Sequence, residues 1–440
     1  MSTSRGLVAV VGRPNVGKST LFNRLVGDRV AIVEDEPGTT RDRLYSPVEW
    51  RGREFTLIDT GGLDDEKGQL EEAVRKQAEA AIDDADVVLF VVDAQTGVLP
   101  VEHDVADRLR RSRKPVILAA NKGESWRTEA QSAEFYELGL GDVFSVSALQ
   151  GTGTGDLLDA IVERLPPPAA DEGETDEARI AIIGRPNVGK SSFLNRLAGA
   201  ERSVVTDIPG TTRDTVDTVI ERAGRRIRLV DTAGIRRRGR IDEGIEKFAL
   251  LRTVRALERA DVGVLVTDAT QGITAQDVHI AGYALEAYIG VVLAVNKWDL
   301  VPHSADNTSA VEAEIGREFH FAPWLVNRFV SAKTGRNVEE TLADAVAVVD
   351  ERKKRISTSE LHRLLVEAVA AHPPPPDRDG KEVRFHHVTQ AKGPAPTFVF
   401  FVDRPAAVHF SYTRYLENRI RGRFAFRGTP IRIELRGARE

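Results

Sequence analysis

The eight residues GRPNVGKS occur twice in this chain of 440 residues, at 12–19 and at 184–191. A single match to the pattern GxxxxGK[ST] is a weak signal, but the same train of short motifs follows each copy. The residue numbers of the two copies differ by a constant offset of 172, which also separates Asp59 from Asp231. A repeat that keeps its register over this length indicates a duplicated domain. The chain is therefore predicted to contain two copies of one nucleotide-binding domain.

The offset between the copies grows further along the chain. It has risen to 175 at the pair Asn121 and Asn296, and to 184 at the pair Ser147 and Ser331. Surface loops change length at little cost in free energy. The second copy is therefore predicted to carry surface insertions of 3 and 9 residues.

Each copy alternates short apolar runs with amphipathic segments, which is typical of a mostly parallel sheet with helices on both faces. The apolar runs are nearly continuous, as expected for strands buried on both sides. The strands predicted for the first copy are residues 7–11, 55–58, 87–92, 116–120 and 143–146. Those predicted for the second copy are residues 179–183, 227–230, 262–266, 291–295 and 329–331. Both copies are therefore assigned to the α/β class.

A different pattern follows the second copy. Ser357 and Glu360 have capping-box spacing ahead of a predicted helix that ends near Ala371, where the run PPPP stops it. The elements predicted after it are strands at 384–390 and 397–402, a helix near 411–421 and a strand at 431–436. The order αββαβ predicts a small α+β domain with one half-exposed sheet.

These patterns divide the chain into four segments. Residues 1–165 and 179–350 are the two predicted nucleotide-binding domains, and residues 351–440 are the predicted α+β domain. Residues 166–178, PPPAADEGETDEA, are rich in proline and acid and contain no aromatic residue. Such a segment cannot bury apolar surface, so a mobile linker is predicted there.

The composition limits the classes of protein that the chain can belong to. Hydrophobic residues make up 41% of it and charged residues 29%, which is ordinary for a globular protein with a large core. No apolar run approaches the roughly 20 residues that cross a bilayer, and the first residues lack the pattern of a signal peptide. We therefore expect a cytoplasmic monomer that binds no membrane. The absence of cysteine excludes disulfides, thiolate metal sites and a cysteine nucleophile.

The net charge of −6 conceals an asymmetry between the two ends of the chain. Residues 351–440 carry 18 Lys and Arg against 10 Asp and Glu, a net +8, whereas residues 1–350 carry 43 against 57, a net −14. A basic domain on an acidic body indicates an anionic partner, with nucleic acid as the leading candidate. The alternative is that the basic face packs against the chain's own acidic domains.

The duplicated loop predicts two phosphate sites. When such a loop joins a strand to a helix, its backbone N–H groups and the positive end of the helix surround the phosphates. Lys18 and Lys190 would reach the β- and γ-phosphates, and the hydroxyls of Ser19 and Ser191 would coordinate Mg²⁺. The loop residues predicted to contact the nucleotide are Gly12, Asn15, Val16, Gly17, Lys18, Ser19 and Thr20 in the first copy, and Gly184, Asn187, Val188, Gly189, Lys190, Ser191 and Ser192 in the second.

Two further motifs predict the rest of the magnesium and γ-phosphate contacts. Asp59 and Asp231 directly follow apolar strands, in DTGG and DTAG, where a carboxylate can hold the metal through water. The N–H groups of Gly62 and Gly234 can then meet the γ-phosphate. In the upstream motif PGTTRD, the predicted mobile ligands of the metal are Thr40 and Thr212, with Thr39 and Thr211 as the adjacent alternatives.

The run NKWD at 296–299 predicts a preference for guanine. Its carboxylate, Asp299, can accept hydrogen bonds from guanine N1–H and N2–H₂, donors that adenine does not present in that arrangement. The first copy reads NKGE at 121–124, so Glu124 takes this role there and the loop must retreat slightly. The remaining residues predicted to line the base are Asn121, Lys122, Ser147 and Ala148 in the first copy, and Asn296, Lys297, Ser331 and Ala332 in the second, with the alanine N–H directed at guanine O6.

Neither copy has the glutamine that orients the attacking water in Ras-type enzymes. Leu63 and Ile235 occupy that position, and an apolar side chain cannot orient water. Asn15 and Asn187 are predicted to compensate by coordinating a monovalent cation that bridges the phosphates. The alternative is that each asparagine braces its own loop.

Taken together, the paired motifs GRPNVGKS, PGTTRD, DT[AG]G and NKx[DE], with DTAGIRRRGRIDEGIEKF after the second copy, closely resemble those of the EngA (Der) family of bacterial GTPases. The resemblance covers nearly the whole chain. It implies two GTPase domains that convert GTP to GDP with Mg²⁺, and a C-terminal KH-like domain. It also implies a role in assembly of the large ribosomal subunit, with that subunit and its rRNA as partners. Similar families with the loop asparagine use K⁺.

The tail departs from an ordinary KH domain. Its glycines, at 380, 393, 422, 428 and 437, never stand three apart, so there is no GxxG loop to grip a single strand. The segments RKKR at 352–355 and RGRFAFR at 421–427 would hold rRNA phosphates, which would make binding strongly dependent on salt. Alternatively, they pack against a GTPase domain, with Phe424 and Phe426 in a core.

The arginine-rich segment 235–248 directly follows the predicted γ-phosphate sensor of the second copy. It is predicted to be a switch that orders with GTP and changes domain contacts. The alternative is a solvated charged face. Two other functions are weighed against a ribosome-assembly switch: a GTPase that drives another RNA-related activity such as tRNA modification, and a binding module without productive hydrolysis.

Overall fold

The computed structural model describes most of the chain. The described residues are 6–27, 45–59, 78–79, 81–82, 84–123, 132–167, 177–199, 206–209, 216–232, 249–302, 304–376 and 380–437. The chain forms two compact units: one comprises Thr3–Ala170 with Ile241–Arg255, and the other Met1–Ser2 with Asp171–Arg240 and Ala256–Glu440. Except for residues 241–255, the second nucleotide-binding repeat therefore belongs to the same unit as the C-terminal domain.

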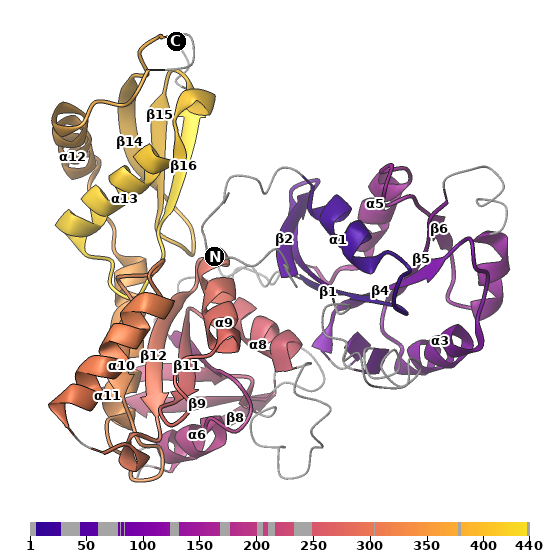
Figure 1. The fold of residues 1–440 in the computed structure, drawn as a ribbon, viewed down its shortest axis with the longest axis horizontal. Coiled ribbons are helices and arrows are strands. Elements are labelled where there is room, and N and C mark those ends of the chain that lie inside the picture. Colours follow the sequence, from indigo (N-terminus) through magenta and orange to yellow (C-terminus); the bar gives the residue numbers. More distant parts are fainter. Residues whose placement is uncertain are drawn as a thin grey trace. The chain divides into compact units, whose positions relative to one another are not determined.

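The first repeat contains a six-stranded sheet in the order β2-β3-β1-β4-β5-β6. Among these described strands, only the pair β2 and β3 is antiparallel. The strands are β1 (Gly6–Val11), β2 (Tyr45–Trp50), β3 (Arg53–Asp59), β4 (Val87–Asp93), β5 (Val116–Asn121) and β6 (Val143–Ser145). The helices are α1 (Lys18–Val26), α3 (Pro100–Ser112), the 3-10 helix η3 (Ser132–Leu138) and α5 (Thr154–Arg164). Helices α1 and α5 share one apolar core, and α3 covers the opposite face of the sheet (Figure 1).

The second repeat contains a seven-stranded sheet in the order β13-β12-β11-β7-β10-β9-β8. Its strands are β7 (Ala178–Ile183), β8 (Thr206–Pro209), β9 (Val216–Arg222), β10 (Arg225–Val230), β11 (Val262–Asp268), β12 (Gly290–Asn296) and β13 (Val326–Phe329). Its helices are α6 (Lys190–Ala198), α8 (Ala249–Glu258), α9 (Ala275–Glu286), the 3-10 helix η5 (Trp298–Leu300), α10 (Ala305–Glu318) and α11 (Val338–Lys353). Strands β8, β9 and β10 pair antiparallel, and the others pair parallel.

The predicted α/β class is confirmed in both repeats. Strands β4 and β11 are buried along their whole length, which is why their sequences are apolar without alternation. The sequence analysis did not predict β2, β8 and β9. The strand predicted at 329–331 is wrong in its position, because β13 ends at Phe329 and Ser331 instead begins a turn that it closes with Arg336.

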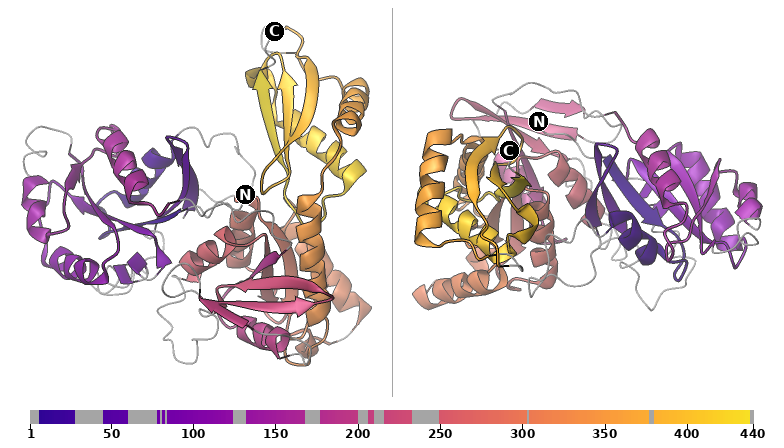
Figure 2. Two further views of the ribbon diagram at one scale, coloured as in Figure 1. Left: turned by 180° about the vertical axis from the view of Figure 1, so that it is seen from behind. Right: turned by 90° about the horizontal axis from the view of Figure 1, so that it is seen from above.

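The C-terminal domain has the predicted order αββαβ. It consists of α12 (Thr358–Ala371), β14 (Phe385–Ala391), β15 (Thr397–Val402), α13 (Phe410–Phe424) and β16 (Arg432–Gly437), with a short 3-10 turn η6 (Pro405–Ala407). The side chain of Ser357 accepts a hydrogen bond from the backbone of Glu360 and closes the capping box that starts α12. Both helices pack on one side of the sheet and share a core with it, as the two further views in Figure 2 also show.

A loop of the C-terminal domain is hydrogen-bonded to the second repeat. The backbone of Gly428 accepts from Val291 at the start of β12 (2.8 Å) and donates to Trp324 just before β13 (2.9 Å). The guanidinium of Arg421 stacks 4.4 Å from the centre of the Trp324 ring. These contacts join the loop around Gly428 to the start of β12 and to the residues just before β13.

The basic segment 352–355 contributes to this junction. Arg352 is buried and donates to the backbone carbonyls of Tyr288 and Pro394 (2.5 and 3.0 Å). Burial lowers the pKa of Arg352 to about 10, although the charge of Asp261 works in the opposite direction. Lys354 donates to the carbonyl of Phe424.

The aromatic residues of the tail also take part in packing. Phe426 is fully buried against Phe398, and Phe424 packs at the edge of the same core. For Arg352, the alternative of packing against a GTPase domain is therefore correct. Phe424 and Phe426 do lie in a core, but it is the core of the C-terminal domain, and Lys354 bonds within that domain. No helix in the described ranges is long and apolar enough to cross a bilayer.

Candidate guanine nucleotide sites

Both phosphate loops connect a central strand to a helix that begins at the loop lysine. The loop follows β1 in the first repeat and β7 in the second, and the helices α1 and α6 start at Lys18 and Lys190. A side chain at Gly12 would place its Cβ 2.3 Å from the carbonyl oxygen of Val91, and Gly184 faces Val266 in the same way. Glycine is therefore required at the first position of each loop, because the neighbouring strand passes so close.

The two loop lysines are held in the same manner. The Nζ of Lys18 donates to the carbonyl oxygens of Gly12 (2.6 Å) and Arg13 (3.0 Å). The Nζ of Lys190 donates to the carbonyls of Gly184 (2.6 Å) and Arg185. In each loop the ammonium group is therefore fixed by two backbone carbonyls of the loop. It lies close to the helix N-terminus, where an anion is favoured.

The first repeat brings together two oxygen ligands of the kind that Mg²⁺ prefers. The hydroxyl of Ser19 donates to Oδ2 of Asp59 across 2.6 Å. Within the described ranges there is no group of three or more His, Asp or Glu side chains that would bind a metal by itself. The donor set fits a metal that is held by one hydroxyl and one carboxylate and that takes its other ligands from water and phosphate.

In the second repeat, the corresponding carboxylate belongs to Asp231. Its backbone has a left-handed conformation (φ 54°), and its N–H donates to Oδ1 of Asp217 across 3.0 Å. Asp231 lies directly after β10, as Asp59 ends β3. Ser191 and Asp231 are the hydroxyl and carboxylate residues at the corresponding positions, so the predicted donor set of the second site has the same chemistry and also fits Mg²⁺.

The asparagine of each base motif ties three loops together. The Nδ2 of Asn121 donates to the carbonyl of Val16 (2.8 Å), and its Oδ1 accepts from the backbone of Ala148 (2.9 Å). Asn296 makes the same two bonds, with Val188 and Ala332, at the same two lengths. Each asparagine is buried and joins the phosphate loop to the predicted base-binding loops.

The serines of the base-binding loops close local turns. Ser147 Oγ accepts from the backbone of Gln150 (3.1 Å), and Ser331 Oγ accepts from Thr334 (3.2 Å). The alanine N–H that follows each serine donates to the asparagine of the base motif. Contact between these alanines and guanine O6 stays a prediction.

The lysine of each base motif is paired with an aspartate that the sequence analysis did not single out. Lys122 Nζ lies 2.7 Å from Oδ2 of Asp93, and Lys297 Nζ lies 2.6 Å from Oδ2 of Asp268. Burial acts to raise the pKa of both carboxyls, but hydrogen bonds from the lysine and from neighbouring groups outweigh it and hold both pKa values below the usual one. These aspartates are therefore charged partners of the lysines.

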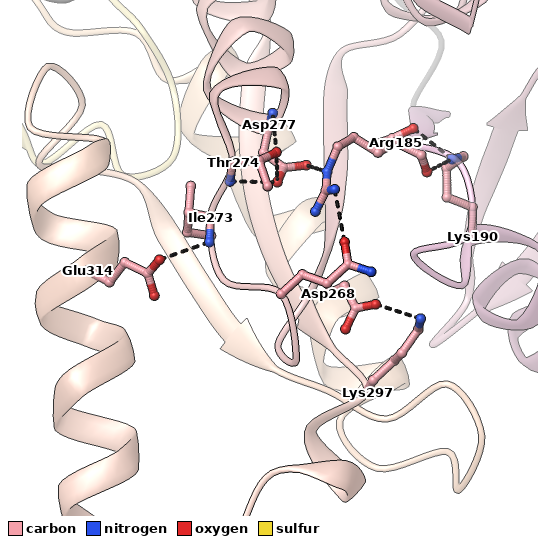
Figure 3. A network of polar contacts seen from close by, with 10 residues as sticks. Arg185, Lys190, Asp268, Ile273, Thr274, Asp277, Lys297 and Glu314 are labelled. Atoms are coloured by element: carbon pink, nitrogen blue, oxygen red, sulfur yellow. Dashed lines mark hydrogen bonds and ion pairs between the residues drawn. The ribbon is translucent and has the colours of Figure 1, made fainter. Parts of the chain in front are cut away.

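The arginine of each phosphate loop reaches the helix that follows this aspartate (Figure 3). Arg185 Nε donates to Oδ1 of Asp277 (2.9 Å), whose Oδ2 accepts from the backbone of Thr274 and caps α9. In the first repeat, Arg13 Nε donates to Glu102 (3.2 Å), which caps α3 in the same way. The phosphate loop is thus tied to the next helix of the sheet.

In the first repeat, the buried acid that binds the loop arginine has a raised pKa. Burial raises the pKa of Glu102, against the effects of its bond to the backbone of Leu99 and of the charge of Arg13.

Comparison with known proteins gives the family. A family model described as the 50S ribosome-binding GTPase matches residues 7–122 and 179–297. A second, described as the KH-domain-like part of EngA bacterial GTPase enzymes at their C-terminus, matches residues 355–436. GTPase Der of Thermomicrobium roseum is 55% identical over 98% of this chain and 95% of its own length. The chain belongs to the EngA (Der) family of GTPases.

Other members of the EngA family are similar over the same extent. GTPase Der of Herpetosiphon aurantiacus is 49% identical over 99% of this chain and 97% of its own, and that of Chloroflexus aggregans 51% over 98% and 97%. Among solved structures, Era in complex with MgGDPNP and a segment of 16S ribosomal RNA is 22% identical over 59% of this chain and 92% of its own, with a TM-score of 0.31. That likeness is too low to bear on ligands. The resemblance predicted from the motifs is confirmed, as is the KH-like C-terminal domain.

Several predicted site residues of this EngA-family chain lie outside the described residues. They are Thr40, Gly62 and Glu124 in the first repeat and Thr212 and Gly234 in the second, together with the alternatives Thr39 and Thr211, the apolar Leu63 and Ile235, and the rest of the predicted switch segment 235–248. Among the described residues, the loop lysine, the base-motif asparagine and the NK lysine nevertheless make the same contacts in both repeats. Asp299 lies half-buried on η5, beside Trp298, which stacks 4.2 Å from the ring of Phe329.

The sequence does contain a signal for these two aspartates, although they belong to none of the motifs described above. Asp93 and Asp268 end the equivalent strands β4 and β11, and their numbers differ by 175, the offset that also relates the two NK motifs. An acidic residue at the end of a fully apolar strand rarely has a structural use in the core. Its recurrence in both repeats was enough to suggest a partner at that edge of the sheet.

Proposed function

We propose that this EngA-family GTPase binds and hydrolyses GTP at both sites and docks on the large ribosomal subunit during its assembly. The observation that carries this proposal is the duplicated site: both repeats hold the loop lysine, the base-motif asparagine and the NK lysine by the same contacts. Both repeats also match a family described by its binding to the 50S particle. In the proposed organisation, residues 1–165 and 179–350 form the GTPase domains and residues 351–440 the KH-like domain, with 166–178 as a linker.

Each site would hold the nucleotide at its two ends. The loop N–H groups and the lysine bind the phosphates, while Asp299, or Glu124 in the first site, accepts the guanine N1–H and N2–H₂. Calorimetry with GTP and ATP tests this assignment. We expect two guanine nucleotides bound per chain and no competing affinity for ATP, and a single nucleotide per chain would contradict it.

Mg²⁺ would be held by the serine and aspartate of each site. Ser19 with Asp59, and Ser191 with Asp231, provide the protein ligands, and Thr40 and Thr212 would join them when the γ-phosphate is present. When bound, the metal stabilises the negative charge that develops on the phosphate oxygens. The lysine of each loop contributes positive charge at the same oxygens.

The attacking water needs another activating group, because Leu63 and Ile235 cannot orient it. Asn15 and Asn187 are exposed at the tips of their loops, both in left-handed backbone conformations (φ 67° and 61°). Neither amide hydrogen-bonds to another residue in the described part of the chain, which favours a ligand over the bracing alternative. The side-chain oxygens would coordinate K⁺ beside the phosphates.

Hydrolysis in KCl and in NaCl tests the role of the asparagines. Faster hydrolysis in KCl, lost in the Asn15→Ala, Asn187→Ala double variant, is the expected result. Equal rates in the two salts, or a potassium response that survives in the double variant, would remove K⁺ from the proposal.

The KH-like domain would contact rRNA phosphates through arginines that packing leaves exposed. Arg419 on α13 and Arg427 after it are exposed, whereas Arg352 and Arg421 are engaged in the junction with the second repeat. Such contacts make binding weaken steeply as salt increases. Replacement of Arg419 and Arg427 by glutamine is expected to reduce that salt dependence.

Co-sedimentation with separated ribosomal subunits tests the proposed partner. We expect binding to the large subunit with a non-hydrolysable GTP analogue and weaker binding with GDP or without nucleotide. Binding that ignores the nucleotide would contradict the switch, and binding to the small subunit alone would contradict the choice of partner.

A further inference from the structure

A buried carboxylate lies behind the predicted metal ligand of the second site. Asp217, the second residue of β9, is 1% exposed. Its Oδ1 accepts the N–H of Asp231 (3.0 Å), and its Oδ2 accepts from Nη2 of Arg259 (2.6 Å). The guanidinium of Arg228 lies 3.8 Å away. Asp217 is therefore a buried charge with both oxygens occupied, which is how a buried carboxylate is stabilised.

The bond from Asp217 fixes a strained point of the backbone. Asp231 has φ 54°, a conformation that residues other than glycine seldom adopt. The next rung is also tied, because the hydroxyls of Thr218 and Thr232 lie 2.9 Å apart in the interior. The start of β9 thus holds Asp231 and Thr232, the two residues that directly follow β10.

The first repeat does not contain this arrangement. At the offset of 172, Tyr45 occupies the position of Asp217, and Asp59 has no positive φ. At the later offset of 175, Asp84 replaces Arg259, so the cation is missing as well. Asp59 is instead held through its own carboxylate by Ser19.

Arg259 connects Asp217 to the end of helix α8. It comes directly after α8, and its N–H donates to the carbonyl of Ala256 (3.3 Å). The guanidinium therefore stabilises the charge of Asp217 from the end of that helix. The ion pair with Arg259 holds the carboxylate of Asp217 in place, so that its Oδ1 faces the N–H of Asp231.

We propose that Asp217, held by Arg259, is a positioning residue for the metal ligand Asp231 in the second site alone. It fixes the main chain of Asp231 so that the carboxylate is presented to Mg²⁺ with the hydroxyl of Ser191. This inference rests on the proposed role of Asp231 as a ligand of the metal. Groups that orient a metal ligand in this way typically change metal affinity by roughly 10- to 100-fold.

The test measures how Mg²⁺ strengthens GDP binding to the full chain. In a Lys18→Ala background, which weakens the first site, calorimetry with GDP is carried out with Mg²⁺ and with EDTA. The Asp217→Ala variant is expected to need about tenfold more Mg²⁺ for the same gain in GDP affinity. Its GDP affinity in EDTA is expected to stay within about twofold of the parent, because the phosphate loop and the base motif are unchanged.

Two further variants separate positioning from a general loss of structure. Asp217→Asn keeps the Oδ1 acceptor for the N–H of Asp231 but removes the charge that Arg259 requires, so an intermediate loss of Mg²⁺ affinity is expected. Arg226→Ala removes an exposed arginine from the adjacent strand β10 and is the matched control, with no change expected. Thermal melting of each variant reports whether it folds, and if Asp217→Ala does not fold, the Asn variant alone decides.

The outcomes distinguish this inference from the proposed function. An Mg²⁺ requirement that is unchanged in both Asp217 variants would overturn the positioning role. A parent protein in which Mg²⁺ does not strengthen GDP binding would contradict the assignment of Asp231 as a metal ligand, which is a failure of the proposed function. Equal losses of GDP affinity with Mg²⁺ and with EDTA would show that Asp217 only maintains the fold.

Discussion

The two nucleotide-binding repeats agree where the nucleotide is bound and differ where the site is supported. Both hold the loop lysine over two backbone carbonyls, and both pair the NK lysine with an aspartate at the end of a central strand. Only the second has the buried Asp217, paired with the half-buried Arg259, behind its predicted metal ligand. The contacts within the predicted nucleotide site are the same in both repeats, whereas those that connect this site to the neighbouring strands differ.

The repeats also differ in what is attached to them. The second repeat has the long helix α10, where the first has the short η3 among its described residues. The offset between the copies increases by nine residues, from 175 to 184, across this region. It also carries the KH-like domain through the loop around Gly428. In the described part of the chain, the KH-like domain is thus bonded directly to the second repeat.

The largest expected effect comes from removing the loop lysine. In Lys18→Ala or Lys190→Ala, GTP hydrolysis at the altered site is expected to fall roughly 100- to 1,000-fold, because a positive charge at the phosphate oxygens is lost. Single-turnover hydrolysis by each full-length variant measures this directly. If one variant abolishes all hydrolysis and the other has no effect, the two sites are not equivalent enzymes.

The next effect concerns the junction between the second repeat and the KH-like domain. Gly428 has φ 67°, and a Cβ there would lie 2.3 Å from a methyl group of Val348. Gly428→Ala is therefore expected to destabilise the unit by about 3 kcal/mol, through strain and overpacking. Thermal or urea unfolding measures the loss, with Gly422→Ala as the control because a Cβ there meets nothing within 4 Å. Equal stability of the two variants would show that the junction adapts.

A smaller effect is expected from the aspartates that hold the NK lysines. Asp93→Ala and Asp268→Ala leave Lys122 and Lys297 without their buried partners, so GDP affinity at each site should fall about tenfold. Fluorescence titration with a labelled GDP measures both variants. The control Asp350→Ala removes an exposed partner of Arg225 and should have no effect. If GDP affinity falls in only one of the two variants, the two lysine–aspartate pairs do not have the same role in nucleotide binding.

The smallest expected effect is the response of these aspartates to acid. Their folded pKa values lie below the ordinary 3.8, so their contribution is fully present above that pH and is lost as the pH falls through the folded values. Lowering the pH from 7.5 to 5.5 should therefore leave the lysine pairs intact in both repeats. Nucleotide affinity that falls by more than about threefold over this range, in the parent but not in the Asp93→Ala, Asp268→Ala variant, would contradict the lowered pKa values.

The central strands and the motifs could be predicted from the sequence, because apolar runs and short signatures are local. The predicted starts and ends of β1, β4, β7 and β12 lie within two residues of the observed ones. Strands β2 and β9 were missed because they lie at or next to the edge of their sheets and mix polar with apolar residues, as in YSPVEW. Their residues become informative only after the pairing with β3 and β10 is known.

The supporting contacts could not be predicted because they join residues that are distant in the sequence. Asp217 and Arg259 lie 42 residues apart, and nothing in the sequence indicates that β9 brings them together. The basic segment 352–355 shows the same limit. Its charges suggested an anionic ligand, but the structure places Arg352 inside the protein, where it donates to backbone carbonyl oxygens. These oxygens accept from a guanidinium as phosphate oxygens would.

The backbone bond between Gly428 and Val291 has a geometric consequence. Val291 is the second residue of β12, and the last residue of that strand is Asn296, which grips the phosphate loop of the second repeat. A single seven-residue strand, about 23 Å long, thus runs from the docking loop of the KH-like domain to the guanine motif. An extended strand changes little in length. A shift of the Gly428 loop along the strand axis is therefore expected to move Asn296, and with it the phosphate loop, by a similar amount.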